Sequence, residues 1–273
     1  MKSNQCQIAI AQMNSSDKVE ENLKQLNEIV NDHQKPIDIM FLPENFAHMP
    51  VTEKDRLDSA EEFGSGRIQD FLAELAKTKN AWIVAGSVPL LSEKKGKIYQ
   101  STLVFDDQGQ RQQRYDKIHL FDVQLANGER YEESSYIEFG DKQQQPWVST
   151  PWGSIGLSIC YDLRFPEHFR AFPEDVFLLS IPAAFTHRTG KAHWQVLLQA
   201  RAIENQCYVA AAAQTGTHSN GRKTWGHSSV INPWGDIISQ NPNDIGLIDA
   251  TVDIGFLQKI RQQLPCLHQK RTP

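Results

Sequence analysis

The clearest candidate for chemistry in this chain is Cys160, which ends an apolar, strand-like run over residues 153–159. The residues after it predict a turn, and Pro166 suits the first position of a helix. At such a corner we expect a cysteine to be exposed at the edge of a sheet. A helix N-terminus beside it would favour the thiolate through free N–H groups and the helix dipole. The alternative is a buried structural cysteine, the commoner fate of a free thiol.

Two further charged residues stand in settings where a solvated charge is unusual. Glu44 follows the apolar segment 37–42 and Pro43, at the mouth of a predicted strand. A carboxylate in such a place suits a general base, and the alternative is a surface glutamate at the start of a loop. Lys117 lies among aromatic and aliphatic neighbours in the segment 115–121. A cation near a thiol lowers the pKa of the thiol, and it can also stabilise an oxyanion.

The nine histidines leave a Cys–His pair possible in principle, but none has a context that singles it out as the base. We expect His168 on the surface of the helix that follows the cysteine. His193 is expected to pack against Trp194, with a ligand-stacking pair as the alternative. We expect His227 to bond backbone near a sheet edge. Cys207 lies inside an apolar run and is interpreted as a core residue.

Length and composition indicate an ordinary soluble globular protein. Of the 273 residues, 40% are hydrophobic and 22% are charged, and the formal net charge is −5. This charge disfavours nucleic acid or an anionic membrane as the main partner. No apolar run approaches the ~20 residues of a membrane-spanning helix, and residues 1–6 do not resemble a signal peptide. The cysteines at 6, 160, 207 and 266 are widely spaced, which argues against a disulfide scaffold or zinc site and predicts a cytoplasmic protein with reduced thiols.

The elements that must position these residues follow from the apolar periodicity. Amphipathic spacing predicts helices over residues 17–33, 66–79, 190–205 and 254–263, the first opened by a capping pair of Asp17 and Glu20. Strands are predicted over residues 7–12, 37–42, 81–86, 98–105, 110–115, 176–181, 207–213, 227–232 and 245–252. Early units alternate strand and helix while later ones form hairpins, so we expect an α/β fold with mixed sheets in a single domain over 1–264, with a tail over 265–273.

Glu44, Lys117 and Cys160, in this order and in these settings, resemble the Glu-Lys-Cys catalytic triad of the nitrilase superfamily of carbon–nitrogen hydrolases. The resemblance covers nearly the whole chain, through segments 8–13, 42–44, 115–120, 160–167, 192–194, 200–205 and 226–230. A second glutamate of that family stands in a Glu-Ser pair, and Glu133 followed by Ser134 matches it, with Gly140 closing the same loop. Glu129 and Glu132 are nearby competitors, but neither precedes a serine.

The resemblance implies a four-layer α-β-β-α sandwich with mixed sheets, and a homodimer or larger assembly formed through helices. It implies that Glu44 removes the proton of Cys160, that the thiolate attacks an amide carbonyl, and that ammonia leaves as a thioester forms. Lys117 and the backbone N–H of Tyr161 would hold the oxyanion, and Glu133 would orient Lys117 or the incoming groups. The chemistry needs no metal and no organic cofactor, and its partner is a small-molecule amide.

The residues around the nucleophile indicate a branch of the family. Nitrile-cleaving members carry Cys-Trp-Glu, whereas Tyr161 and Asp162 follow the cysteine here, which points to an amidase acting on a primary amide. Segments 192–198, 205–216 and 264–265 resemble the deaminated glutathione amidase branch. The alternatives are an omega-amidase acting on 2-oxoglutaramate, or a non-enzymatic binding or scaffold protein. Arg164 is a candidate for holding a substrate carboxylate or for a structural ion pair.

The chain also departs from the family pattern. Lys191 stands where proline is common, and Gln195 stands where glutamate is common. The loop 124–132 lacks a proline often found there. Because that loop leads to Glu133 and is expected to shape the pocket, substrate choice is the property that these departures affect most.

Overall fold

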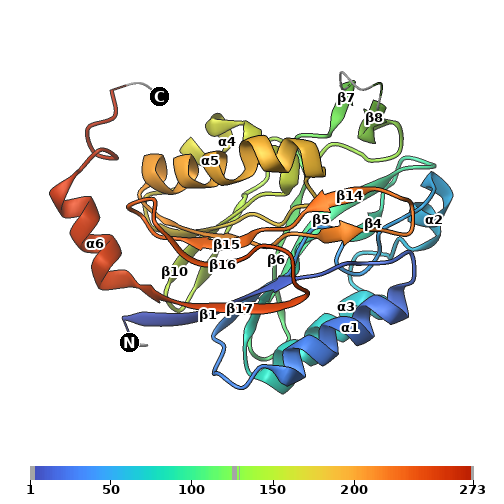
Figure 1. Ribbon diagram of the computed structural model, residues 1–273, viewed down its shortest axis with the longest axis horizontal. Coiled ribbons are helices and arrows are strands. Elements are labelled where there is room, and N and C mark those ends of the chain that lie inside the picture. Colours follow the sequence, from blue (N-terminus) through green and yellow to red (C-terminus); the bar gives the residue numbers. More distant parts are fainter. Residues whose placement is uncertain (1–3, 125–127, 129, 272–273) are drawn as a thin grey trace.

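The computed structural model describes residues 4–124, 128 and 130–271. Over these residues the chain forms two large mixed sheets that lie between two helical layers (Figure 1). This arrangement is the four-layer α-β-β-α sandwich predicted from the sequence. The two sheets contribute their facing sides to one large core, and the site described below lies where strands of both sheets end.

The first sheet has seven described strands in the order β17-β1-β2-β3-β5-β4, with β6 paired to β5. Strands β1, β2 and β3 are parallel, and the remaining pairs are antiparallel. The bounds of these strands are β1 (Gln5–Gln12), β2 (Ile39–Phe41), β3 (Trp82–Val84), β4 (Val88–Leu91), β5 (Ile98–Phe105), β6 (Arg111–Asp116) and β17 (Gly246–Asp253).

The second sheet has six described strands in the order β16-β15-β12-β11-β10-β9. Strands β10, β11 and β12 are parallel in its centre. Two small hairpins, β7 with β8 and β13 with β14, stand apart from both sheets. The bounds are β7 (Asp122–Gln124), β8 (Arg130–Glu132), β9 (Trp147–Thr150), β10 (Gly153–Leu157), β11 (Val176–Ser180), β12 (Tyr208–Ala211), β13 (Thr215–Thr217), β14 (Lys223–Trp225), β15 (Ser228–Ile231) and β16 (Ile237–Asn241).

Helices cover the outer faces of the two sheets (Figure 1). The first sheet carries α1 (Val19–Asp32) and α3 (Arg67–Lys79), and the second carries α4 (Pro166–Arg170) and α5 (His187–Asn205). Two more helices, α2 (Glu53–Asp58) and α6 (Ile254–Gln263), lie at the ends of the sandwich, and two short 3₁₀-helices are η1 (Glu133–Ser135) and η2 (Cys160–Arg164).

Alternation along the strands of the first sheet explains the layering. In β2, Ile39 and Phe41 belong to the core between the two sheets, whereas Met40 belongs to the core beneath α1 and α3. In β3, Val84 faces the first of these cores and Ile83 the second. Both faces of the sheet are therefore apolar, as is expected for strands covered on both sides.

The structure corrects the predicted start of the first helix. Lys18, and not Asp17, is the N-cap residue of α1, and it makes no side-chain capping bond. Tertiary contacts decide this: the buried Asn22 side chain accepts from Ser16 N at 2.8 Å and donates to Ala47 O at 2.8 Å. Glu20 turns away from the helix start and forms a bidentate pair with Arg67 at 2.9 Å.

The other predicted segments overlap the observed elements, and most of their ends are shifted. Helix α6 has the predicted bounds, and α5 begins earlier than predicted because Thr186 acts as its N-cap. Most predicted strands are shorter in the structure. Helix α2 and the short strands β4, β7, β8, β9, β13, β14 and β16 have no counterpart in the sequence prediction.

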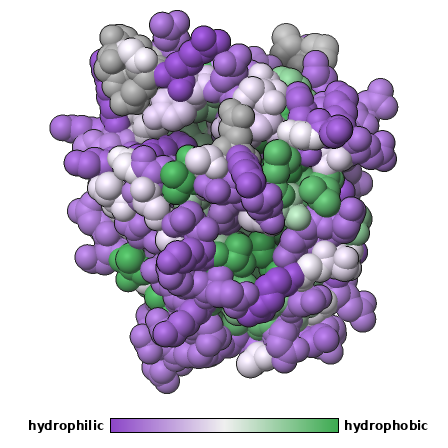
Figure 2. Space-filling view, turned by 90° about the vertical axis from the view of Figure 1, so that its right-hand side faces the viewer, coloured by the Kyte–Doolittle hydropathy of each residue, from purple (hydrophilic) through white to green (hydrophobic). Residues whose placement is uncertain are grey.

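The face of the molecule on the side of α2 and β14 is mostly hydrophilic, with apolar residues exposed in separate patches (Figure 2). Among the described residues, no helix combines the length and the apolar character needed to cross a lipid bilayer.

Candidate active site

The structure brings together all four residues that the sequence resemblance assigns to catalysis. Glu44 follows β2, Lys117 follows β6, Cys160 follows β10, and Glu133 begins η1 just after β8. The first two come from the first sheet, and the cysteine comes from the second. Opposed strand ends of the two sheets therefore meet at one point, which is where α/β folds commonly place their functional groups.

Lys117 is the centre of this cluster. Its Nζ atom donates to Glu44 Oε1 at 3.0 Å and to Glu133 Oε2 at 2.8 Å. The lysine is 1% exposed and Glu44 is 3% exposed. A buried ammonium is costly unless it is paired with charge and hydrogen-bonded. Here two carboxylates satisfy both conditions.

The charged groups of the cluster stabilise one another in their ionised forms. Burial disfavours the ammonium form of Lys117, but Glu133, Glu44 and Cys160 outweigh this effect, and its pKa is raised. Burial also opposes ionisation of Glu133. The Lys117 charge, its hydrogen bond and a hydrogen bond from Phe121 N at 2.8 Å together outweigh burial, so the pKa of Glu133 is lowered. Lys117 is therefore protonated and Glu133 is ionised at neutral pH.

Gly140 is required by the close approach of the chain behind Lys117. Its N–H donates to Lys117 O at 2.9 Å. A Cβ atom at this position would lie 2.1 Å from Asp116 O, which is well inside van der Waals contact. Only glycine leaves room for the backbone bond that fixes the lysine strand.

Cys160 differs from the expectation in two respects. It is buried, at 8% exposed, and not open at the sheet edge. Burial and the neighbouring Glu44 carboxylate raise the pKa of its thiol well above the ordinary value, although Lys117 and a hydrogen bond from the Ala184 backbone act in the opposite direction. The expectation of a resting thiolate is therefore wrong. The Glu44 carboxylate that raises this pKa is beside the thiol, in a position to accept its proton.

The turn that presents Cys160 is held by the buried side chain of Asp162, for which no structural role was predicted from the sequence. Cys160 has a left-handed backbone, with φ of +49°, a conformation that costs ~1 kcal/mol for a side-chain-bearing residue. Asp162 accepts from Ile159 N at 2.8 Å, from Tyr115 Oη at 2.7 Å, and from His119 N and Nδ1 at 3.0 and 2.7 Å. Burial opposes its ionisation, but these partners and His168 lower its pKa.

The three histidines considered above, His168, His193 and His227, contact groups other than the Cys160 thiol. His168 is buried and bonds Leu157 O at 2.9 Å, so its predicted place on the helix surface is wrong. His227 bonds Trp225 O, as predicted. The predicted His193–Trp194 packing is also wrong, because successive helix residues point to different sides. Trp194 is buried, and His193 is exposed.

Glu44 is anchored from a third direction. Its Oε2 atom accepts from Ala184 N at 2.9 Å, and its backbone carbonyl accepts from Gln214 Nε2 at 3.0 Å. Gln214 is itself held by Ser15 through two hydrogen bonds, at 2.8 and 3.0 Å. Polar residues from four separate segments thus fix the carboxylate next to the thiol.

Tyr161 and Arg164 lie at the opening of the site. The backbone N–H of Tyr161 is in the first turn of η2, where N–H groups lack partners within the helix. Arg164 contacts His193 Nδ1 at 3.2 Å, and its guanidinium lies 5.2 Å from the ring centroid of Phe185. Among the described residues it forms no ion pair with a carboxylate, so its charge is available to a ligand.

A small cavity opens over the cluster. Its lining combines the charged residues with aromatic and hydroxyl side chains: Glu44, Phe121, Glu133, Cys160, Tyr161, Arg164, Ala184, Phe185, Thr186, Thr189 and Arg222. Four of these lining residues, Phe185, Thr186, Thr189 and Arg222, were not predicted as site residues, because no sequence motif separates them from ordinary loop and helix residues.

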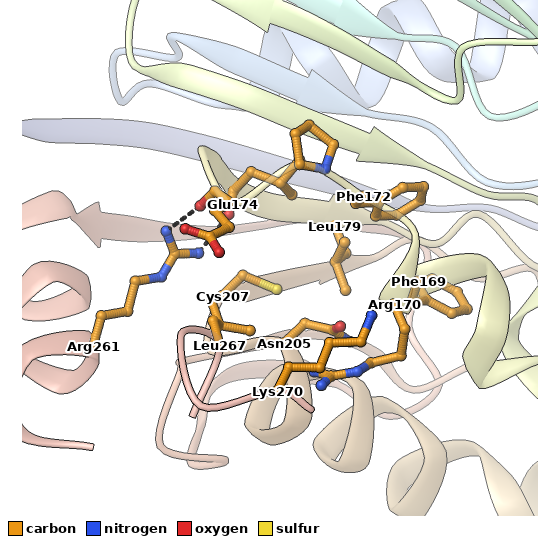
Figure 3. Close-up of a pocket in the computed structure, with 12 residues that line it drawn as sticks. Phe169, Arg170, Phe172, Glu174, Leu179, Asn205, Cys207, Arg261, Leu267 and Lys270 are labelled. Atoms are coloured by element: carbon orange, nitrogen blue, oxygen red, sulfur yellow. Dashed lines mark hydrogen bonds between the residues drawn. The ribbon is translucent and has the colours of Figure 1, made fainter. Parts of the chain in front are cut away.

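A second cavity lies at the opposite ends of β11 and β12, under the C-terminal segment (Figure 3). Arg261 lies at one side of it and donates to Glu174 O, Val176 O and Gln206 O. Cys207 lies there as the predicted core residue, and burial raises its pKa to about 12. Arg261 joins α6 to the sheet, so we interpret this cavity as structural.

In the part of the chain that the structure describes, no group of three or more His, Cys, Asp or Glu side chains is arranged to hold a metal ion. Four residues of the loop 124–132, whose sequence departs from the family pattern, lie outside the described residues: 125–127 and Glu129. The competitor Glu132 is described, and it pairs with Arg130 at 3.0 Å and not with Lys117. Glu133 is thus the described glutamate of this segment that contacts the lysine.

Sequence comparison agrees with this geometry. A sequence model of the family described as carbon-nitrogen hydrolase matches residues 7–262. The chain belongs to this family. The resemblance inferred from the sequence is confirmed, and membership places the protein among the hydrolases that act on carbon–nitrogen bonds.

Similar proteins extend over almost the whole chain. The deaminated glutathione amidase of Yersinia enterocolitica is 39% identical over 267 residues, which cover 97% of this chain and 92% of that protein. The deaminated glutathione amidase of a Synechocystis strain is 40% identical over 265 residues, covering 96% and 97%.

Solved structures show the same fold. The C. elegans NitFhit protein superimposes with a TM-score of 0.88 at 34% identity, over 99% of this chain and 66% of that chain. Saccharomyces cerevisiae Nit3, described as a member of branch 10 of the nitrilase superfamily, gives a TM-score of 0.86 at 27% identity, over 99% and 98%.

Proposed function

We propose that this carbon–nitrogen hydrolase is a deaminated glutathione amidase that works through Cys160. The observation that carries the proposal is the buried cluster in which Glu44 contacts both the thiol and Lys117. Near-full-length relatives that bear this name, at 39% and 40% identity, support the choice of substrate.

The first half of the reaction follows from the contacts. Glu44 takes the proton of Cys160, and the thiolate forms a bond to the amide carbonyl carbon while the carbonyl electrons move to oxygen. Lys117 Nζ and the Tyr161 N–H stabilise this oxyanion, a contribution of ~3 kcal/mol per donor. Glu133 is a positioning residue, because its hydrogen bond and charge keep Lys117 protonated and directed at the site.

The second half reuses the same base. Protonated Glu44 gives its proton to the departing amine as the C–N bond breaks, which leaves an acyl thioester on Cys160. Glu44 then removes a proton from water, the water attacks the thioester, and the thiol re-forms as the acid departs. All proton transfers pass through one carboxylate that Ala184 N and Gln214 hold in place.

The leaving group distinguishes the two candidate substrates. In deaminated glutathione the amide joins a 2-oxo acid to the cysteine nitrogen, so the products are 2-oxoglutarate and cysteinylglycine. Ammonia, the product expected from the sequence, leaves only from a primary amide such as 2-oxoglutaramate. Release of 2-oxoglutarate is therefore the common measure of both reactions.

The test compares both substrates with purified protein, using Cys160→Ala as the inactive control. We expect a higher kcat/KM for deaminated glutathione than for 2-oxoglutaramate. A preference for the small oxo-amide would move the chain to the omega-amidase function with the same mechanism. Release from neither substrate would contradict the proposed substrate, and full activity of Cys160→Ala would contradict the mechanism.

We also infer that the protein is a homodimer or a larger assembly that pairs through α5. Val196 and Ile203 are seven residues apart on one face of this helix, and they are 67% and 51% exposed. Trp234, next to Gly235 whose Cβ position faces Ile203, is 57% exposed. Large apolar side chains gathered on one face favour association.

A cytoplasmic location is the accompanying proposal. No disulfide joins Cys6, Cys160, Cys207 or Cys266, all of which lie in the described part of the chain, and the first three are buried. A nucleophilic cysteine that must stay reduced suits a reducing compartment. Fractionation of the source cells with an antibody to the protein tests this location.

A further inference from the structure

A broad basic cavity opens next to the catalytic cavity. It is larger than the catalytic cavity, and its lining includes Arg56, Arg130 and Arg222. None of its lining residues in the described part of the chain is an aspartate or glutamate. Arg222 lines both cavities, so the two spaces meet at this side chain.

Arg222 is linked directly to the catalytic cluster. Its Nη2 atom donates to Ala184 O at 2.5 Å, and Ala184 N donates to Glu44 Oε2 at 2.9 Å. The guanidinium also lies 5.5 Å from the ring centroid of Tyr131. Its buried Nε atom has no hydrogen-bond partner among the described residues. Arg222 therefore does not use all of its N–H donors within the described protein, and its side chain lines an open cavity. An arginine in such a position is suited to bind a carboxylate.

The other two arginines add positive charge, and among the described residues neither forms an ion pair with a buried carboxylate. Arg130 pairs with Glu132 at 3.0 Å, but both side chains are more than half exposed, so water screens this pair and its exchange for another anion costs little. Arg56 donates to the neutral amide oxygen of Gln100 at 3.1 Å and lies over the ring of Tyr136. The cavity is therefore suited to an anion.

The proposed substrate carries an anion at the required place. Deaminated glutathione has one carboxylate on its 2-oxo acid half and another on the terminal glycine, beyond the amide that is cleaved. Two residues separate the cleaved carbonyl from that second carboxylate, a reach of ~7 Å when extended. With the carbonyl at Cys160, the glycine end must leave the small catalytic cavity, and the basic cavity is next to it.

We propose that the basic cavity binds the terminal glycine carboxylate of the leaving cysteinylglycine, with Arg222 and Arg130 as its main contacts. Arg164, on the catalytic cavity, remains for the carboxylate of the 2-oxo acid half. This assignment rests on the proposed function, and it makes charge at the far end of the substrate a determinant of specificity.

The test uses two substrates that differ in one charge: deaminated glutathione and its analogue with the glycine carboxylate replaced by a carboxamide. For the unaltered protein we expect kcat/KM to be about 10- to 100-fold lower for the carboxamide. In Arg222→Gln and in Arg130→Gln the ratio of the two values should fall toward one. Arg67→Gln, which removes a distant exposed arginine, is the matched control and should keep the full ratio.

Two results would overturn the inference and leave the proposed function intact. One is equal hydrolysis of both substrates by the unaltered protein. The other is a ratio that persists in both cavity variants, which would mean that the carboxylate binds elsewhere. Arg130→Gln is essential, because Arg222→Gln could also disturb Ala184 and Glu44. Hydrolysis of neither substrate by the unaltered protein would instead contradict the proposed function itself.

Discussion

Lys117 donates to Glu44 at 3.0 Å across 73 positions of sequence, deep inside the protein. In the proposed mechanism this ion pair joins the general base to the group that stabilises the oxyanion. Glu133 contacts Lys117 from the other side at 2.8 Å. Removing any member of the cluster takes a charged partner away from the others.

Removing the central cation should affect both activity and stability. Lys117→Met leaves Glu44 and Glu133 as unpaired carboxylates in a buried place, which typically costs ~3 to 5 kcal/mol of unfolding free energy. We expect a folded but less stable protein without measurable 2-oxoglutarate release. Urea unfolding and the activity assay check this together, with exposed Lys95→Met as the control. Unchanged stability would mean that the two carboxylates find other partners.

Glu44→Gln should make the Cys160 thiol easier to ionise and yet lower the turnover. Because the Glu44 carboxylate raises the pKa of Cys160, its removal should shift thiol ionisation to lower pH. Turnover should nevertheless fall by at least ~100-fold, since the proton acceptor is lost. Titration of thiolate absorbance in the ultraviolet, compared with Cys160→Ala, gives the first result. A shift to higher pH would be inconsistent with the site geometry.

Glu133→Gln tests the positioning role. We expect a large fall in kcat with little change in KM and a protein that remains folded, because Glu133 acts through Lys117. A rise in KM alone would assign Glu133 to substrate binding. Exposed Glu93→Gln, at a position outside both cavities, is the control and should retain the kinetics of the unaltered protein.

Acid should destabilise the protein through its two lowered carboxyl pKa values. Glu133 and Asp162 have ordinary pKa values of 4.5 and 3.8, and both are lowered in the fold. Their stabilisation is complete above those values and is lost as pH falls through the lowered folded values, because the unfolded chain binds protons first. Unfolding free energy should therefore be lower at pH 3 than at pH 6, a difference that shrinks in Glu133→Gln. An unchanged pH slope in that variant would contradict the prediction.

Charge placed on α5 should disrupt assembly. Val196→Asp together with Ile203→Asp puts two carboxylates in the proposed interface, where they would be desolvated at high cost. Light scattering after size exclusion should show monomers for this variant and dimers or larger assemblies for the unaltered protein. A matched change at Leu91, an exposed residue outside α5, should leave the assembly intact.

Much of the site could be predicted because its local signals are strong. A charged residue directly after an apolar strand, as at Glu44, and a cysteine at a strand-to-turn junction, as at Cys160, are visible in the sequence itself. Helices α3 and α6 likewise follow from periodicity. In contrast, the cap of α1 was mispredicted, because a buried side chain from within the helix, Asn22, overrides the local capping pattern.

The family, the layered α/β architecture and the identity of the clustered groups could be predicted, since each depends on residue types and their order along the chain. Folding was needed to show that the Cys160 thiol is buried and protonated at rest, that Asp162 braces its turn, and that Arg222 lines both cavities. These properties arise from desolvation and from charges brought close by folding. Neither has a counterpart in local sequence, because the partners lie far apart along the chain.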